Sequence, residues 1–445
     1  MKTLRIPLAL LIGVTAVAVA TAGPFTPGNL VIYRVGDGTL DLTNRGNVVF
    51  LDEYTTNGTL VQSIMLPTNA AGTQYPLIAS GTATSEGLIT RSTDGRFLVF
   101  AGYGTNLTSG LALAGTAATD VPRVVGRADA LGNLDTTTAL TNFSSANNPR
   151  SVASDNGVNL WVGGGAGGVA YTTLGGTAVT TVSTTPVSNI RQVAIYGGQL
   201  YLSTASGSAV RIGAVGTGLP TSGPVTTTSL PGLPTSGGGP YAFVLLNLTG
   251  GPNLDTLYVA DETFNAIVKY SLVGGSWVGN GSIAATAVRG LTAAVAIGGG
   301  ATNVHLYGTT GGAGALGGGS LYAANDTAGH NAPPSVTNVT VIATAAPRTA
   351  FRGIAFAPIG AVTPPQITGL ELVGNNVRVT WTTSGGTTNY VQAVSTPTGS
   401  LVPSGFADIS GPIPIPGSGP VLTNYVEVDA RTNQPARYYR IRVAP

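Results

Sequence analysis

The chain has 445 residues, of which 65 are glycine, 9% are charged and none is cysteine. The absence of cysteine excludes disulfide bonds and thiolate metal sites. Lysine and arginine number 20 against 18 acidic residues, and this balance argues against a nucleic-acid-binding protein, which needs a basic surface. Low charge with abundant glycine is typical of an exported β protein that contains many turns.

The first 22 residues have the pattern of a secretory signal peptide. Lys2 and Arg5 precede an apolar run over residues 6–20, and small residues occupy positions 20–22. This pattern predicts cleavage before Gly23. The alternative is a membrane anchor, but the run is short for a bilayer span of about 20 residues. We therefore expect a mature chain without a membrane span, secreted, at the cell surface or in the periplasm, and the lack of cysteine favours a bacterial source.

A repeated unit organises most of the remaining chain. Each unit has a strand of small residues, a turn that contains glycine, and a second strand with an aromatic residue, as in RSVASDNGVNLWVG over residues 150–163. Units start at residues 86, 150, 191, 241, 289 and 352. The spacing of about 40 to 65 residues is that of four-stranded propeller blades with loop insertions.

The two ends of this repeated region complement each other. Residues 352–358 form a first strand with no second strand after it, whereas residues 29–37 read as a second strand with no first. Residues 48–56 and 60–66 follow as third and fourth strands. The sequence therefore predicts an all-β, six-bladed propeller closed by N- and C-terminal strands, which removes open sheet edges. Seven blades are the alternative, because the long first unit and residues 308–320 could hide strands.

Two stretches carry a resemblance to a known family. Residues 149–162 (PRSVASDNGVNLWV) and 257–270 (LYVADETFNAIVKY) resemble NHL-type and the related YVTN-type propeller repeats. The resemblance covers roughly residues 29–358 and implies a fold rather than an activity, since such propellers serve as enzymes, binding modules and structural modules.

Long glycine- and threonine-rich insertions at residues 102–121, 213–239 and 308–319 are expected to be surface loops. Such loops could carry a binding surface, or they could be solvated connectors without a partner.

The pattern changes after the propeller, which is expected to span residues 23–360. Residues 361–365 form a proline-containing linker, and residues 366–445 contain short runs of alternating polar and apolar residues. This alternation predicts a small β-sandwich. Trp381 and the closing stretch YYRIRV at residues 438–443 resemble fibronectin type III or immunoglobulin-like modules, in which Trp381 would fill the core.

The sequence offers few residues for catalysis. The only histidines are His305 and His330, and no Gly-x-Ser-x-Gly motif accompanies them, so a catalytic triad is not expected. Asp261 follows a strand, where its carboxylate can cap the turn; Ca²⁺ ligation is the alternative. We expect no catalytic residue, metal or cofactor.

Alignment of the unit starts gives one candidate binding site. The first strand of each blade is innermost, so the residues at these positions would surround one mouth of the central channel. Guanidinium groups there could bind a carboxylate or sulfate of a polysaccharide. In the alternative, each arginine bonds carbonyl groups of a neighbouring blade. The candidate residues are Arg150, Arg191, Arg289, Arg352, Glu86 and Tyr241.

These observations favour an exported binding or structural protein whose ligand is a glycan or another protein. The alternative is an extracellular hydrolase or lyase that acts in the channel, and a third interpretation is polymer assembly through the C-terminal module.

Overall fold

The computed structural model describes residues 23–444 except 252, 299–300, 361–363, 396–404, 417–419 and 431–435. The expected signal peptide therefore lies outside the described residues, as does most of the expected linker. The described part is all-β, and its helical content is limited to two short 3₁₀ helices, η1 (Leu107–Ser109) and η2 (Leu113–Gly115).

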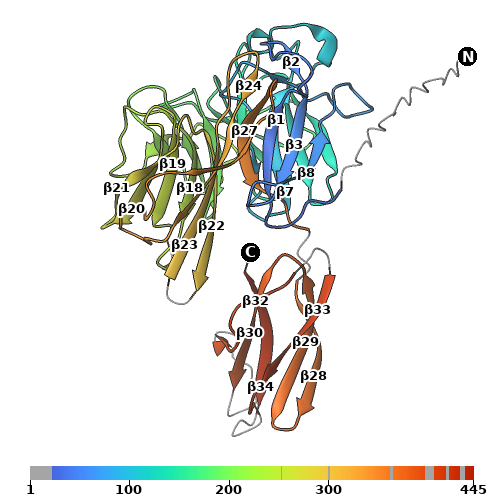
Figure 1. Ribbon diagram of the computed structural model, residues 1–445, viewed down its shortest axis with the longest axis vertical. Helices are drawn as coiled ribbons and strands as arrows, with labels where there is room; N and C mark the ends of the chain where they lie inside the picture. The colour runs from blue at the N-terminus through green and yellow to red at the C-terminus, as the bar shows by residue number, and fades with distance from the viewer. Residues whose placement is uncertain are drawn as a thin grey trace, which may run out of the picture.

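The strands within residues 23–360 form mainly antiparallel sheets in which strands close in sequence are paired (Figure 1). Five sheets have four strands each: β6 (Thr90–Arg91), β7 (Phe97–Tyr103), β8 (Arg123–Asp129) and β9 (Leu134–Leu140); β10 (Pro149–Ser154), β11 (Asn159–Gly164), β12 (Val169–Thr173) and β13 (Thr180–Ser183); β14 (Gln192–Tyr196), β15 (Gln199–Ser203), β16 (Ile212–Val215) and β17 (Thr227–Ser229); β18 (Pro240–Leu246), β19 (Thr256–Asp261), β20 (Ala266–Val273) and β21 (Ser276–Ala284); β22 (Gly290–Gly298), β23 (Ala301–Thr309), β25 (Ser320–Asp326) and β26 (Thr340–Thr344).

A further sheet combines strands from the two ends of this region. Its order is β24 (Gly317–Gly318), β27 (Thr349–Phe356), β1 (Leu30–Val35), β3 (Val49–Tyr54) and β4 (Leu60–Met65). β27 pairs with β1 in antiparallel fashion, with Leu30 opposite Phe356. This pairing is the one that the incomplete units at the two ends of the repeated region predict. A small additional sheet joins β2 (Gly46–Asn47) and β5 (Ala79–Ser80).

The first strand of each sheet lies beside the first strand of the next. We call β27, β6, β10, β14, β18 and β22 the inner strands; they neighbour one another in that order, and β22 neighbours β27. Hydrogen bonds join these neighbours, for example from Gly353 N to Gly87 O at 2.9 Å and from Leu88 N to Arg150 O at 3.0 Å. Residues near the beginnings of the inner strands are thereby held close together.

Local sequence explains the tight hairpins of these sheets. Between β10 and β11, the Asn156 side chain accepts a hydrogen bond from Val158 N at 2.8 Å. Gly157 has a φ of +76°, and a Cβ there would lie 2.3 Å from the Phe97 ring. Only glycine meets both the backbone and the packing requirement of this turn.

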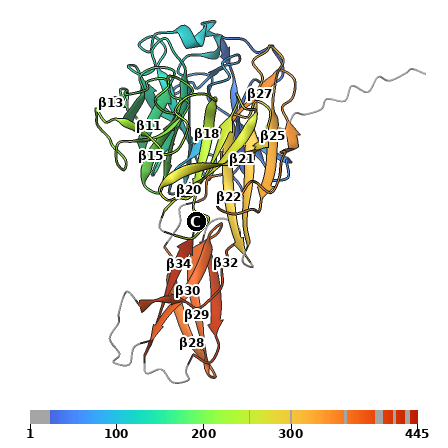
Figure 2. The same ribbon diagram turned by 90° about the vertical axis from the view of Figure 1, so that its left-hand side faces the viewer.

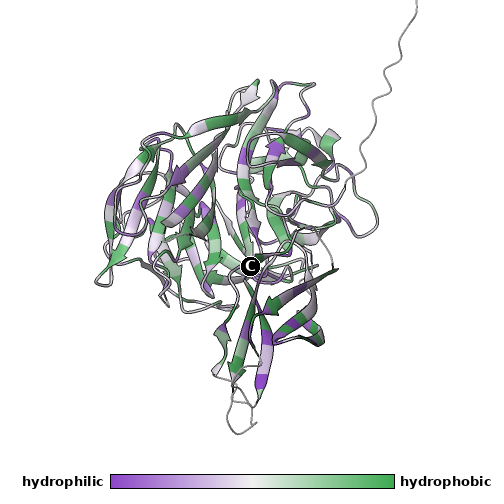
Figure 3. Cartoon of the chain, turned by 60° about the horizontal axis from the view of Figure 1, so that its bottom comes forward, coloured by the Kyte–Doolittle hydropathy of each residue, from purple (hydrophilic) through white to green (hydrophobic). Residues whose placement is uncertain are grey.

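The hydrophobic core lies between the faces of neighbouring sheets. Val99 and Val125 of one sheet pack with Val152, Leu160 and Val162 of the next. Figure 3 shows hydrophobic residues recurring along these strands. The strands β7, β10 and β11 are buried almost without interruption, because each sheet is covered by a neighbouring sheet on both faces.

One expectation about the insertions is partly wrong. Residues 102–121 are not only surface loop, because Leu113 of η2 and Val121 are buried with Ile78 and Tyr103. The apolar residues of this insertion therefore form a small core of their own.

Residues 364–444 form two further sheets, which Figure 2 shows apart from the other sheets. One contains β28 (Gln366–Val373), β29 (Asn376–Ser384) and β33 (Pro420–Glu427), and the other contains β30 (Thr388–Ser395), β31 (Ala407–Asp408), β32 (Ile413–Pro414) and β34 (Arg437–Ala444). Trp381 is fully buried with Val379 and Val391, which confirms its predicted place in a core.

Candidate functional site

The structure brings the residues at the unit starts together. Arg150 is the second residue of β10, Arg191 directly precedes β14, and Arg289 directly precedes β22. Tyr241 lies near the beginning of β18, and Arg352 lies within β27. Because the inner strands are neighbours, these side chains meet at one end of them. We call Arg150, Arg191, Arg289 and Arg352 the arginine cluster.

Tyr241 lies among these guanidinium groups. The Cζ atoms of Arg191 and Arg289 lie 4.6 and 5.3 Å from the centre of its ring, within the range of cation–π attraction. Arg289 also forms an ion pair with Glu262, in which Nη2 and Oε2 are 2.6 Å apart. Arg289 is therefore partly neutralised.

Arg150 and Arg352 are buried and bond to the backbone of neighbouring sheets. Nη1 of Arg150 donates to Ile190 O at 2.9 Å, and Nη2 of Arg352 donates to Gly81 O at 2.9 Å. These bonds match the structural alternative for the two residues. However, the Nε atoms of both are buried and have no hydrogen-bond partner among the described residues. Each guanidinium group thus retains a donor that no protein acceptor satisfies.

Arg191 differs from the other members of the arginine cluster. Within the described part of the chain its side chain has no hydrogen bond, and its main contact is the Tyr241 ring. It is half-buried rather than exposed. A half-buried guanidinium group without an acceptor can bind an anion without first breaking a protein hydrogen bond.

The charge of Glu86 acts on Arg352, but its carboxylate forms hydrogen bonds with residues outside the arginine cluster. Its carboxylate accepts hydrogen bonds from Tyr103 Oη at 2.6 Å, from Ser80 N at 3.2 Å and from the Asn148 side chain. Burial raises the pKa of Glu86, although these bonds and the charge of Arg352 oppose the increase. Glu86 is therefore a poor counter-ion for four arginines.

The arginine cluster carries excess positive charge. Burial, together with the neighbouring charge of Arg191, lowers the pKa of Arg150 to about 10. Burial likewise lowers the pKa of Arg352 to about 10, with Arg289 adding to the effect. Both groups remain cationic at neutral pH, and among the described carboxylates only Glu262 forms an ion pair with the cluster. An anion between these groups would relieve their mutual repulsion.

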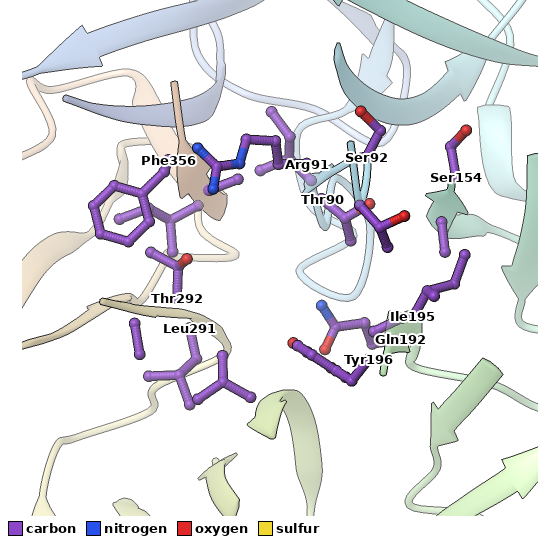
Figure 4. A pocket seen from close by; sticks show the side chains of 18 of the residues that line it. Thr90, Arg91, Ser92, Ser154, Gln192, Ile195, Tyr196, Leu291, Thr292 and Phe356 are labelled. Atoms are coloured by element: carbon purple, nitrogen blue, oxygen red, sulfur yellow. The ribbon is translucent and has the colours of Figure 1, made fainter. Parts of the chain in front are cut away.

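A cavity of about 320 Å³ extends along the inner strands, from Gln192 and Leu291, which follow Arg191 and Arg289 closely in sequence, to the last residues of several of these strands. Figure 4 shows side chains that line it. We call it the central cavity. Its lining includes the last residues of β10, β14, β18 and β27, which are Ser154, Tyr196, Leu246 and Phe356. Arg91 of β6 also lines it and donates one hydrogen bond, to Ala357 O at 3.3 Å. The repeat pattern gives no indication of this cavity, although the position of Arg91 at the end of a first strand was a usable signal.

Other expectations concern capping and metals. Oδ1 of Asp261 accepts hydrogen bonds from Thr263 N and Phe264 N at 3.0 Å, which confirms the predicted turn cap. In the described part of the chain no group of three or more His, Asp or Glu side chains is arranged to hold a metal ion. The same residues include no helix of the length and apolarity needed to cross a membrane.

Comparisons with known proteins give no family. No family model and no curated protein matches the chain. Among solved structures, the soluble aldose sugar dehydrogenase of Escherichia coli has a TM-score of 0.40 and 13% identity over 66% of this chain and 98% of its own. A glucose dehydrogenase has a TM-score of 0.40 and 14% identity over 68% of this chain and 98% of its own. A candidate 6-phosphogluconolactonase of Bacteroides uniformis has a TM-score of 0.37 and 12% identity over 89% of this chain and 100% of its own. Similarity at this level identifies neither a family nor an activity.

Proposed function

We propose that residues 23–360 form a six-bladed β-propeller of the NHL-like kind, closed by the pairing of β27 with β1. The neighbour order of the inner strands supports this proposal. Residues 361–365 then link the propeller to a fibronectin type III-like or immunoglobulin-like sandwich over residues 366–445. With residues 1–22 as a cleaved signal peptide, the protein would act in the periplasm, outside the cell or at its surface.

The proposed function is the binding of an anionic ligand at the arginine cluster. The observation that carries the proposal is Arg191, a half-buried guanidinium group on the Tyr241 ring with no hydrogen bond among the described residues. The buried guanidinium groups of Arg150 and Arg352 add to the positive charge around it. Planar guanidinium donors suit carboxylate and sulfate oxygens, so the ligand class is a glycan that carries such groups.

The expected strength follows from the type of bond. A hydrogen bond to a charged group contributes about 1.5–3 kcal/mol, and each 1.4 kcal/mol changes affinity tenfold. Loss of Arg191 alone should therefore weaken binding by roughly tenfold to a hundredfold. Because the cluster is at most half-exposed, moderate salt should weaken binding less than it weakens binding to a surface charge.

The test is calorimetric titration of the full mature chain with an oligosaccharide that carries both sulfate and carboxylate groups. Arg191→Gln should reduce its affinity at least about tenfold. Arg378→Gln removes the same charge from an exposed ion pair with Glu371 and should have no effect. Equal affinities for the two variants would refute the proposal. Cleavage of the oligosaccharide during the titration would instead favour the hydrolase or lyase alternative.

A further inference from the structure

A second cavity adjoins the central cavity. It has a volume of about 350 Å³ and lies between the sheets that begin with β14 and β18. We call it the side cavity. Tyr196 and Gly197 line both cavities. The two cavities are therefore adjacent at the end of β14, with Tyr196 and Gly197 between them.

Aromatic side chains form fixed walls where the cavities meet. Tyr196 donates a hydrogen bond to Phe243 O at 2.7 Å, which fixes the orientation of its ring. The centre of the Tyr201 ring lies 6.4 Å from that of Tyr196. Trp277 lines the far part of the side cavity. Rigid aromatic walls provide apolar contact with little loss of conformational entropy on binding.

Several hydrogen-bonding groups along these walls are not used by the protein. Within the described residues, the hydroxyl of Tyr201 and the indole N–H of Trp277 have no hydrogen bond, although both side chains line the side cavity. Thr292 adds a hydroxyl in the central cavity (Figure 4). Aromatic faces interspersed with free donors and hydroxyl acceptors match a ligand that has both apolar ring faces and many hydroxyl groups.

Charge identifies one end of the ligand. Among the described residues that line the two cavities, Arg91 alone carries a charge. Its guanidinium group donates to Ala357 O, and its side chain is one of those that line the central cavity (Figure 4). The Arg91 end therefore suits a carboxylate, which can accept two parallel hydrogen bonds from a guanidinium group.

We infer that the two cavities form one binding groove for an acidic oligosaccharide, with a uronic acid carboxylate at Arg91 and a following sugar ring against Tyr196 and Tyr201. Each cavity is near the lower end of the 300–1,000 Å³ range of small-molecule sites, so each would accept about one sugar ring. In this groove the charged contact is Arg91 rather than a member of the arginine cluster, which adjoins the other end of the central cavity.

The test is calorimetric titration of the mature chain with three probes: trigalacturonate, triglucuronate and neutral galactotriose. At least one acidic trimer should bind more tightly than galactotriose. Arg91→Gln should remove this preference and weaken binding of that trimer about tenfold or more. Tyr201→Ala should weaken the binding of the acidic and neutral trimers by a similar factor, because it removes stacking rather than charge.

Matched controls separate this inference from the proposed function. Arg96→Gln removes an exposed charge between β6 and β7, where the guanidinium group of Arg96 lies over the Phe97 ring outside both cavity linings. It should leave trimer affinity unchanged. Arg191→Gln should also leave it unchanged. Melting temperatures verify that each variant folds, and Tyr201→Phe tests the hydroxyl alone if Tyr201→Ala does not fold.

Three results would overturn the inference. The first is the absence of saturable binding by all three trimers. The second is an affinity for the acidic trimer that Arg91→Gln leaves intact. A hexaglutamate peptide serves as a competitor: displacement of the acidic trimer by this peptide at equal concentration would favour an acidic peptide ligand and contradict the assignment to a glycan.

Discussion

Replacement of Lys269 by methionine should destabilise the N-terminal sheets strongly. Lys269 Nζ lies 2.8 Å from Asp326 Oδ2, and both side chains are fully buried. Nζ also donates to Gly329 O at 2.7 Å, and Tyr258 Oη donates to the same carboxylate at 2.6 Å. This network joins β20 to the end of β25, which belong to neighbouring sheets. Lys269→Met would therefore leave a buried carboxylate without its counter-ion.

The magnitude follows from this geometry. Removal of one partner of a buried ion pair costs about 3–5 kcal/mol. An unfolding entropy of about 2.1 cal/mol/K per residue gives about 0.7 kcal/mol/K for a unit of roughly 340 residues. The melting temperature should therefore fall by about 4–7 °C. Differential scanning calorimetry at pH 7 measures this decrease.

The pH dependence gives a second test of the same variant. Burial alone would raise the pKa of Asp326, but hydrogen bonds from Lys269, Tyr258, Ser335 and Ala328 outweigh it and hold the pKa below its usual value. A carboxyl with a lowered folded pKa stabilises the protein above its unfolded pKa of about 3.9, and this contribution is lost as pH falls through the folded value. The difference in stability between wild type and Lys269→Met should therefore become smaller below about pH 4.

Two results would refute this reasoning. Arg348→Met is the control: it breaks an exposed ion pair with Asp41 and should lower the free energy of unfolding by less than about 1 kcal/mol. If Lys269→Met lowers the melting temperature no more than Arg348→Met does, the role assigned to the Lys269–Asp326 pair is contradicted. An unchanged difference between pH 7 and pH 3 would show that lost packing, rather than charge, causes the destabilisation.

Three further predictions concern backbone packing, the C-terminal core and processing. Gly353→Ala should lower the melting temperature in calorimetry, because its Cβ would lie 2.4 Å from Ile89 N, whereas Gly360→Ala meets no atom within 4 Å and should have little effect. Trp381→Ala should remove the thermal transition of the C-terminal sheets, since loss of a buried tryptophan costs about 3–5 kcal/mol; a scan identical to wild type would contradict this. Mass spectrometry of the secreted protein should find Gly23 at its N-terminus, and a chain that still begins at Met1 would contradict the predicted cleavage.

Periodicity explains why much of the fold could be predicted from sequence. The strand–turn–strand pattern at residues 150–163 predicts β10 and β11 because an Asp-Asn-Gly sequence strongly favours a tight hairpin turn. The pairing of β27 with β1 followed from incomplete units at the two ends. By contrast, buried Leu113 within a glycine-rich insertion has no periodic neighbours, so the sequence pattern indicated only a loop.

The candidate site was predictable in position but not in bonding. Equivalent positions in repeated units placed Arg150, Arg191 and Arg289 at one end of the inner strands. Which arginine is satisfied depends on loops far away in sequence: Glu262 pairs with Arg289, whereas Arg191 receives no such partner among the described residues. Likewise, the partner of Lys269 lies 57 positions away, and no local pattern could identify it.

The most direct test of anion binding at the arginine cluster is an anomalous diffraction measurement on crystals soaked in selenate, an analogue of sulfate. At low millimolar selenate, we predict a selenium peak beside Arg191, at a distance at which selenate oxygens accept hydrogen bonds from its guanidinium group, and loss of this peak in Arg191→Gln crystals. Selenium peaks only at exposed arginines such as Arg378, with none at the cluster, would contradict the account.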